Sequence, residues 1–169
     1  LLSNYICSLV CVEGVVIKCS LVQPKVVRSV HWCETTKKHS SREYRDATAL
    51  DIGIQTTGGQ ANTQTGSAYP TKDENGNPLE TEFGLCTYKN HQTVVIQEMP
   101  ERAPLGQLPR SIDLILDYDM VDSCKPGDRV QCMGVYRAMG SQQDGTTTGV
   151  FKTKVLCNQV QVIGQDFEM

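Results

Sequence analysis

The sequence predicts a mainly β domain, on three observations. Ile112, Leu114 and Leu116 alternate with polar residues, which is the period of a half-buried strand. Glycine and proline turns recur between segments of this kind. Prolines crowd residues 100–109, which excludes a helix there because proline lacks an amide donor. We therefore expect strands joined by turns, with one long surface loop.

The first strand is expected over residues 9–22, where both alternating registers are largely apolar, as in a strand covered on both faces. Gly14 interrupts this strand at a position that suits a bulge or bend. Residues 23–25 predict a turn, and residues 26–32 continue as a second strand.

Between residues 33 and 84 the composition changes to threonine, serine, glycine, asparagine and glutamine. Residues 55–67 are a low-complexity tract without packable periodicity, which predicts a mobile loop. This composition predicts a lobe inserted into the domain. Short apolar pieces are expected to hold the lobe together, namely Tyr44, Leu50, Tyr69 and Leu79.

The strand pattern resumes after the lobe. Residues 93–97 are a β-branched run typical of a central strand. The proline-rich loop and the strand around Leu114 follow, and then a Lys-Pro-Gly-Asp turn at residues 125–128. Residues 130–136 alternate again, and a polar tip at residues 141–145 predicts a hairpin with a returning arm.

No repeat of about 20 to 50 residues is visible, and the strand spacing favours a five-stranded OB-fold barrel over a sandwich. We expect residues 1–33 to form the first part of the barrel. Residues 34–87 are expected to form the inserted lobe, which is zinc-ribbon-like but degenerate. Residues 88–169 complete the barrel and include the loop at 97–110 and a long hairpin at 135–155.

Several long motifs resemble one protein family. VCVEGVVIKCSLVQPKVVRSVHW begins at Val10, YPTKDENGNPLETEFG at Tyr69 and QEMPERAPLGQLPRSIDLIL at Gln97, and the Lys-Pro-Gly-Asp turn follows. Together they resemble the N-terminal domain of the MCM replicative helicase subunits, most of all the eukaryotic subunit 3 paralogue, a DNA replication licensing factor. The resemblance covers nearly the whole chain.

The resemblance implies a DNA-binding, ring-forming domain of a hetero-hexameric helicase that acts in the nucleus in origin licensing and unwinding. The implied partners are DNA and the other MCM subunits, with no membrane. ATP and Mg²⁺ would belong to the motor domain, which is expected to lie outside this chain, as is most of a leading helical part. The loop at 97–110 is implied to meet that motor through Gln97, Glu98, Pro100, Glu101, Gly106 and Pro109.

No enzymatic site is predicted in the chain itself. A phosphate-binding loop needs a lysine and a following helix, whereas the nearest match, residues 140–147, has no lysine and lies between two strands. No nucleophile, base and orienting acid stand out, and Cys86 with His91 are more simply a strand thiol and a loop imidazole. Four carboxylates near the Leu114 strand are expected to face solvent: Asp113, Asp117, Asp119 and Asp122.

Composition and charge limit the remaining classes. A hydrophobic content of 39% and a charged content of 21% are ordinary for a globular domain. Glu13 and Lys18 break the longest apolar run, which argues against a membrane-spanning helix, and we expect an intracellular protein. The 8 cysteines are expected to be buried free thiols in the main. The net charge of −3 restricts any contact with DNA to local basic groups.

A zinc site is not expected, although the lobe carries zinc in related MCM subunits. Structural zinc takes four Cys or His ligands in two closely spaced pairs, and this chain has no CxxC. Cys33 stands where the family has its first ligand, but Thr36 occupies the partner position and residues 70–73 supply no second pair. We therefore expect the chain to fold without metal. The scattered candidates that remain are His31, Cys33, His39, Cys86 and His91.

Basic residues give the clearest functional pattern. Lys152 and Lys154 share one strand face because side chains alternate, and Arg137 lies on the facing arm of the hairpin. A groove for DNA phosphates is predicted from these three together with Lys25, Arg28 and Arg110.

Three other interpretations of these cations remain open. The cations form a solvated surface, or the domain is a protein-interaction module that packs against other subunits without touching DNA. A standalone single-strand binder is less favoured, because aromatic residues that stack on bases make up only 6%. The isolated chain is expected to be mainly monomeric.

Overall fold

A computed structural model describes residues 2–45, 64–65, 69–139, 142–143, 146–147 and 149–164. The chain divides into two compact units, the first made of Leu1–Gln23 with Asn90–Met169 and the second of Pro24–Lys89. Strands dominate both units, as predicted. Within the described ranges no helix is long and apolar enough to cross a membrane.

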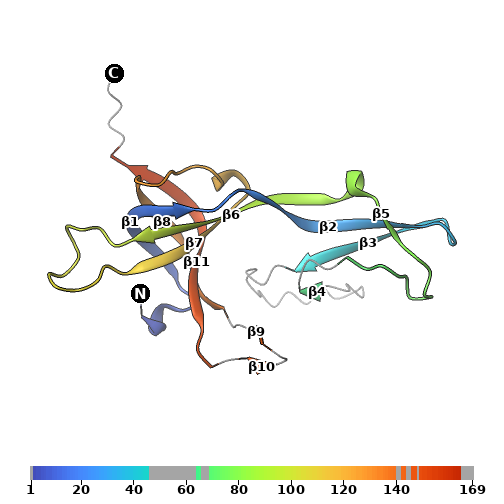
Figure 1. The fold of residues 1–169 in the computed structure, drawn as a ribbon, viewed down its shortest axis with the longest axis horizontal. Coiled ribbons are helices and arrows are strands. Elements are labelled where there is room, and N and C mark those ends of the chain that lie inside the picture. Colours follow the sequence, from blue (N-terminus) through green and yellow to red (C-terminus); the bar gives the residue numbers. More distant parts are fainter. Residues whose placement is uncertain are drawn as a thin grey trace, which may run out of the picture. The chain divides into compact units, whose positions relative to one another are not determined.

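Five strands of the first unit pair in a closed ring (Figure 1). Their order is β1, β8, β11, β7, β6 and back to β1, and all neighbours are antiparallel except β11 and β7. Two 3-10 helices, η1 (Ser3–Tyr5) and η3 (Tyr118–Met120), belong to the same unit. The strand bounds are β1 (Leu9–Cys19), β6 (Thr87–Gln97), β7 (Ser111–Asp117), β8 (Arg129–Met139) and β11 (Lys152–Ile163).

The ring surrounds an apolar core. Leu114, Leu116 and Val130 are almost completely buried, and each comes from an inward-facing position of its strand. Ile115 lies between Leu114 and Leu116 in β7, so its side chain points to the opposite face of the strand. It is nevertheless buried. The alternating pattern therefore predicted the core face of β7 correctly but missed the burial of its outer face.

Strand β1 changes partners next to Gly14, and its register irregularity lies two to four residues after the position where a bulge was expected. β1 pairs with β8 up to Val15 and with β6 from Val15 onward, and its register shifts between Val16 and Lys18. A Cβ atom on Gly14 would lie 2.6 Å from the carbonyl oxygen of Gln97, so no other residue fits without a shift of the backbone.

The predicted Lys-Pro-Gly-Asp turn forms. The amide of Asp128 donates to the carbonyl of Lys125 at 3.1 Å, and Gly127 has a φ of 98°, which glycine adopts without steric cost. The turn is bonded to β1, since Val16 donates to the Asp128 carbonyl at 2.9 Å and accepts from Gly127 at 2.7 Å.

The second unit is built on β2 (Gln23–Cys33), which pairs with β3 (Lys38–Arg45) and β5 (Glu80–Thr81). The turn predicted at residues 23–25 is wrong, because β1 ends at Cys19 and β2 already begins at Gln23. Pro24 is tolerated there, since a strand end has little need of its amide. η2 (Phe83–Leu85) and the short β4 (Gln64–Thr65) complete the unit.

The predicted mobile tract and the predicted hairpin tip lie largely outside the described residues. Of the low-complexity tract at 55–67, only β4 is described. Of the hairpin tip at 141–145, only β9 (Gln142–Gln143) is described, and it pairs with β10 (Thr146–Thr147).

Candidate nucleic-acid interface

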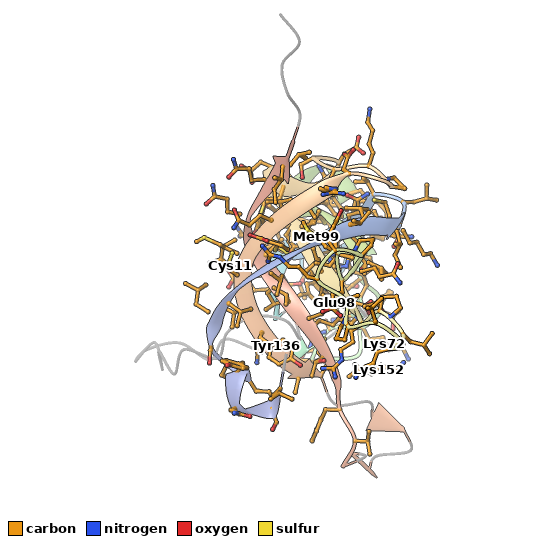
Figure 2. All side chains as sticks on the ribbon, turned by 90° about the vertical axis from the view of Figure 1, so that its left-hand side faces the viewer. Cys11, Lys72, Glu98, Met99, Tyr136 and Lys152 are labelled. Carbon is orange, nitrogen blue, oxygen red and sulfur yellow. The ribbon has the colours of Figure 1, made fainter. Side chains whose placement is uncertain are left out.

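Three predicted cations meet on neighbouring strands. Arg137 of β8 lies directly opposite Lys154 of β11, and Lys152 stands two residues further along the same strand. Tyr136 and Val155 point into the core with 4% and 0% exposure, so these three cations face outward. Lys152 is exposed and the other two are half-buried. Tyr136 and Lys152 are labelled in Figure 2. We call Arg137, Lys152 and Lys154 the basic face.

An acid lies beside the basic face. Lys154 is the register partner of Asp113 in the parallel pair of β11 and β7, so Lys154 stands between Arg137 and Asp113. Like charges directly opposite in a sheet repel, and a neighbouring carboxylate offsets that repulsion. The sequence predicted only that Asp113 faces solvent. The residues around Asp113 in the sequence do not show which residue of a parallel strand will be its partner.

The other acids of this strand differ from one another. Asp119 and Asp122 are exposed, as expected. Asp117 is instead partly buried, and its Oδ1 lies 2.8 Å from Nδ1 of His91, its register partner on β6. The expectation that Asp117 simply faces solvent is therefore wrong.

Lys25 and Arg28 belong to the second unit and do not share a face. They stand three residues apart in β2, and side chains of a strand alternate, so the two point to opposite sides. Lys25 is half-buried, whereas Arg28 is exposed and lies opposite Glu43 of β3.

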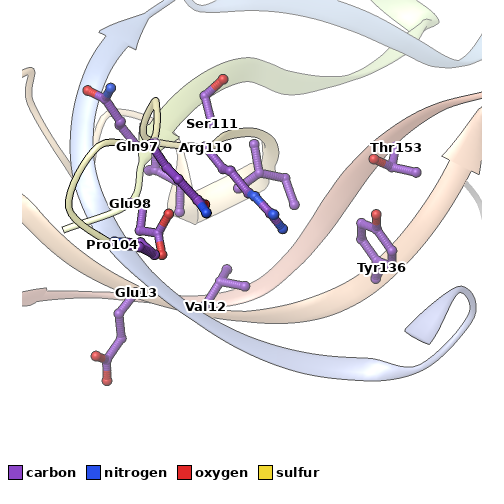
Figure 3. A pocket seen from close by; sticks show the side chains of 12 residues that line it. Val12, Glu13, Gln97, Glu98, Pro104, Arg110, Ser111, Tyr136 and Thr153 are labelled. Carbon is purple, nitrogen blue, oxygen red and sulfur yellow. The ribbon is translucent and has the colours of Figure 1, made fainter. Parts of the chain in front are cut away.

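Arg110 lies at a pocket of the first unit with a volume of about 470 Å³. Its side chain extends into the middle of the pocket, between Gln97 and Glu98 on one side and Tyr136 and Thr153 on the other (Figure 3). The walls combine apolar and hydrogen-bonding groups. Arg110 is the cation among the lining residues, and its guanidinium can donate to a phosphate or a carboxylate.

The proline-rich loop is closed at its base and is fastened to the ring at two places. The amide of Glu98 donates to the carbonyl of Arg110 at 2.9 Å, which closes the base of the loop. Arg102 pairs with Glu13 of β1 at 2.8 Å, and Arg129 of β8 pairs with Glu101 at 2.6 Å. Sequence reasoning missed both ion pairs, because their members are far apart in the chain.

The tip of this loop is apolar and open. Leu105 and Leu108 are 104% and 91% exposed, next to Gly106, whose φ is 84°. Pro100 and Pro109 are exposed as well. The loop is therefore tied at its base and presents two large apolar side chains to solvent near its tip.

Comparison with known proteins identifies the family. The model of the MCM OB domain matches residues 1–140. The chain belongs to the MCM family. The maternal DNA replication licensing factor mcm3 of Xenopus laevis is 57% identical over 159 residues, which are 94% of this chain and 18% of that relative.

Two further relatives agree. DNA replication licensing factor MCM3 of Oryza sativa subsp. indica is 51% identical over 166 residues, which are 98% of this chain and 20% of that relative. DNA replication licensing factor Mcm3 of Drosophila melanogaster is also 51% identical over 166 residues, which are 98% of this chain and 19% of that relative. The chain thus spans about a fifth of these relatives. The resemblance to the MCM subunits, and to subunit 3 among them, is confirmed.

The expectation that the chain folds without metal stays a prediction. Among the described residues, no three His, Cys, Asp or Glu side chains form a group that would hold a metal ion. Hydrogen bonds from Thr36 lower the pKa of Cys33, so Thr36 does lie beside the sulfur, but a hydroxyl does not replace a thiolate ligand.

The other scattered candidates each have different surroundings. His39 lies against Trp32, with ring centroids 4.6 Å apart. Cys86 donates to the carbonyl of Glu82 at 3.2 Å, and His91 contacts Asp117.

His31 lies at the centre of a buried hydrogen-bonded network in the second unit. Its exposure is 0%, its Nε2 lies 2.7 Å from Ser29 Oγ, and its Nδ1 lies 3.1 Å from Thr81 Oγ1. Ser29 donates onward to the Tyr44 hydroxyl at 3.0 Å, so Ser29 is left to accept from Nε2–H. In a neutral imidazole with this tautomer, Nδ1 accepts from Thr81, so both ring nitrogens have a partner.

Aromatic rings pack beside this network. Tyr69 contacts the rings of His31, Tyr44 and Phe83 edge-on, at centroid distances of 5.8, 6.1 and 6.5 Å. Such edge-to-face pairs add to the stability that burial alone supplies. Two of the apolar pieces expected to hold the lobe together, Tyr44 and Tyr69, thus meet here.

We expect the second unit to lose stability as the pH falls below about 6.5. Burial, and next the charge of Arg42, lower the pKa of His31 from its ordinary value of 6.5. As the pH falls, the unfolded chain binds a proton that the folded chain resists. The free energy of unfolding therefore decreases by at most about 1.4 kcal/mol per pH unit. Hydrogen exchange of β2 amides at pH 7.5 and pH 5 measures the effect.

The control for this titration is His39→Gln, at an exposed position of the same unit. His31→Gln should remove most of the pH dependence of the β2 protection factors, which correct for the intrinsic pH dependence of exchange, whereas His39→Gln should keep it. Equal pH dependence of the protection factors in the His31 variant and the parent would contradict the role of His31.

Proposed function

We propose that this chain is the DNA-binding and ring-forming N-terminal domain of a subunit of the MCM replicative helicase, on an OB-fold barrel. Numbered in chain order, the five ring strands pair as 1-2-3-5-4-1, which supports a small closed Greek-key barrel. Residues 34–87 are proposed to be the lobe inserted into it.

The basic face carries the proposal for DNA. Arg137 and Lys154 are register partners and Lys152 is next on the same face, so the three charges form a short row along the hairpin arms. A row of this kind follows the phosphates of one strand, and its affinity for DNA falls as salt rises. Arg110 in its pocket adds a fourth cation within the first unit.

The whole protein is proposed to act in origin licensing and unwinding in the nucleus, in a hetero-hexameric ring with other MCM subunits. ATP and Mg²⁺ would bind its motor domain, which the proline-rich loop is proposed to contact. The two exposed leucines at the loop tip and the ion pairs at its base support this, because they present a fixed apolar surface.

The alternative is an interaction module that packs against other subunits without touching DNA. Two observations favour it: the net charge of −3 and the carboxylate of Asp113 beside Lys154. Both reduce the attraction of the basic face for phosphate.

A triple variant distinguishes the DNA-binding domain from the interaction module. In it, alanine replaces Arg137, Lys152 and Lys154 together. If each contacts a phosphate of single-stranded DNA, the slope of log K against log salt falls by up to about 2, because each contact contributes about 0.7. The fold should survive, since surface strand cations that are exposed or half-buried contribute little to stability. Fluorescence anisotropy with a labelled oligonucleotide over a salt series measures the slope.

The matched control removes three exposed cations outside the basic face, Lys38, Lys72 and Lys125, and so changes the net charge equally. If DNA binding depends on the basic face, we expect the affinity and the salt slope to fall only in the variant that lacks Arg137, Lys152 and Lys154. If both triple variants bind as the parent does across salt, the basic face is solvated and the interaction module is preferred. If both lose the same slope, the effect is overall charge and the proposed site is wrong.

A further inference from the structure

Two thiols meet inside the ring. Sγ of Cys132 on β8 lies 2.6 Å from Sγ of Cys157 on β11, and the two residues are 0% and 7% exposed. A covalent S–S bond is about 2.05 Å long, so the sulfurs are about 0.6 Å from bonding distance. No part of the proposed function uses this pair.

The local sequence explains why the sulfurs approach so closely. The register partner of Cys157 is Gly134, which has no side chain, and Cys132 stands two residues further along the same inward face of β8. The register then shifts between Cys157 and Gln159. The Cys157 side chain therefore leans over the glycine toward Cys132.

Two other cysteines of this unit are neighbours: Cys19 donates to the backbone carbonyl of Cys124 at 3.8 Å, and the two thiol side chains interact. Cys7 and Cys11 are exposed. They serve as internal controls for reactivity, because all 8 cysteines of the chain are free thiols in this structure.

We propose that Cys132 and Cys157 form an intrachain disulfide when the chain meets a peroxide, which makes the pair an oxidative modification site between β8 and β11. Cys157, the more accessible sulfur, attacks a peroxide oxygen, so that an S–O bond forms, the O–O bond breaks and water leaves with the thiol proton. Cys132 then attacks the sulfenic sulfur, forming S–S and releasing a second water. Two thiols and one hydrogen peroxide thus give one disulfide and two waters.

The reaction is expected to be slow. The hydrogen bond with Cys132, and next burial, raise the pKa of Cys157, so its reactive thiolate is scarce at neutral pH. Exposed Cys7 and Cys11 should react first with both peroxide and alkylating reagents. Once formed, the bond ties the two strands that carry the basic face.

Peptide mapping tests the proposal on the unmodified chain. The chain is incubated with hydrogen peroxide, its remaining thiols are alkylated in denaturant, and the digest is analysed by mass spectrometry. A linked pair of Cys132 and Cys157 peptides that dithiothreitol separates is the expected result. Two alkylated free thiols at the time when Cys7 and Cys11 are fully oxidised, or separate sulfinic acids, would overturn it.

A thermal measurement gives a second readout. The bond should raise the melting temperature of the peroxide-treated chain over the reduced chain by about 5 °C, because it restricts the unfolded state. Cys157→Ser should lose this difference, and Cys124→Ser, the matched buried variant, should keep it. The same difference in both variants would assign the effect to other cysteines and overturn the proposal.

Discussion

Replacing Leu114 with alanine is expected to lower the free energy of unfolding by about 3 kcal/mol. Leu114 is 1% exposed, and its register partners Val94 on β6 and Val155 on β11 are 0% exposed. The substitution removes buried apolar surface and also leaves a cavity, because strands held on both sides cannot move in to fill it.

Urea unfolding followed by circular dichroism measures this loss. Leu108→Ala makes the same chemical change at a position that is 91% exposed, and it should alter stability by no more than about 0.5 kcal/mol. Similar losses in the two variants would contradict the assignment of β7 to the centre of the core.

Local patterns were enough to predict the parts of the fold that depend on near neighbours. The alternation around Leu114 predicted a strand and its inward face, because side chains alternate whatever the partner strand is. The Lys-Pro-Gly-Asp turn was predictable because glycine at the third position permits the positive φ that the turn needs. Gly14 was expected to mark a bulge or bend, but the register shift lies between Val16 and Lys18, and at Gly14 the structure shows a close approach of the Gln97 carbonyl instead.

What the sequence did not predict depends on partners that are distant in the chain. β3 was missed because Tyr44 is almost its only apolar residue, and its strand conformation rests on pairing with β2. The neutralising position of Asp113 depends on a parallel register with Lys154, and the contact of Arg102 with Glu13 joins residues that the whole second unit separates in the sequence. Periodicity carries no information on such registers.

The candidate site was predicted in part for the same reason. Alternation along a single hairpin arm placed Lys152 and Lys154 on one face, and antiparallel pairing added Arg137. Applied to Lys25 and Arg28, the same rule separates them, because an odd spacing in a strand sends two side chains to opposite faces. Their inclusion in one groove rested on proximity in sequence rather than on this geometry.

Replacing Gly134 with alanine is expected to cost about 3 kcal/mol of stability, because the added methyl group has no room. A Cβ atom there would lie 2.8 Å from Cγ1 of Val155 and would collide with the backbone carbonyl of Leu156. Gly134 is also held by Val10 of β1 on its other side, so β8 cannot move away without breaking a second pairing. Backbone atoms cannot rotate aside as a flexible side chain would.

The matched control is Gly149→Ala in the same unit, where an added Cβ meets no described atom within 4 Å. Alanine there should leave stability unchanged or raise it by a few tenths of a kcal/mol, since alanine restricts the unfolded chain. Urea unfolding compares the two variants, and hydrogen exchange locates the loss. We expect faster exchange along β8 and β11 in the Gly134 variant alone, together with slower formation of the Cys132 to Cys157 bond. A Gly134 variant as stable as the parent would show that β8 and β11 are not in such close contact, and would remove the geometric reason for the thiols to meet.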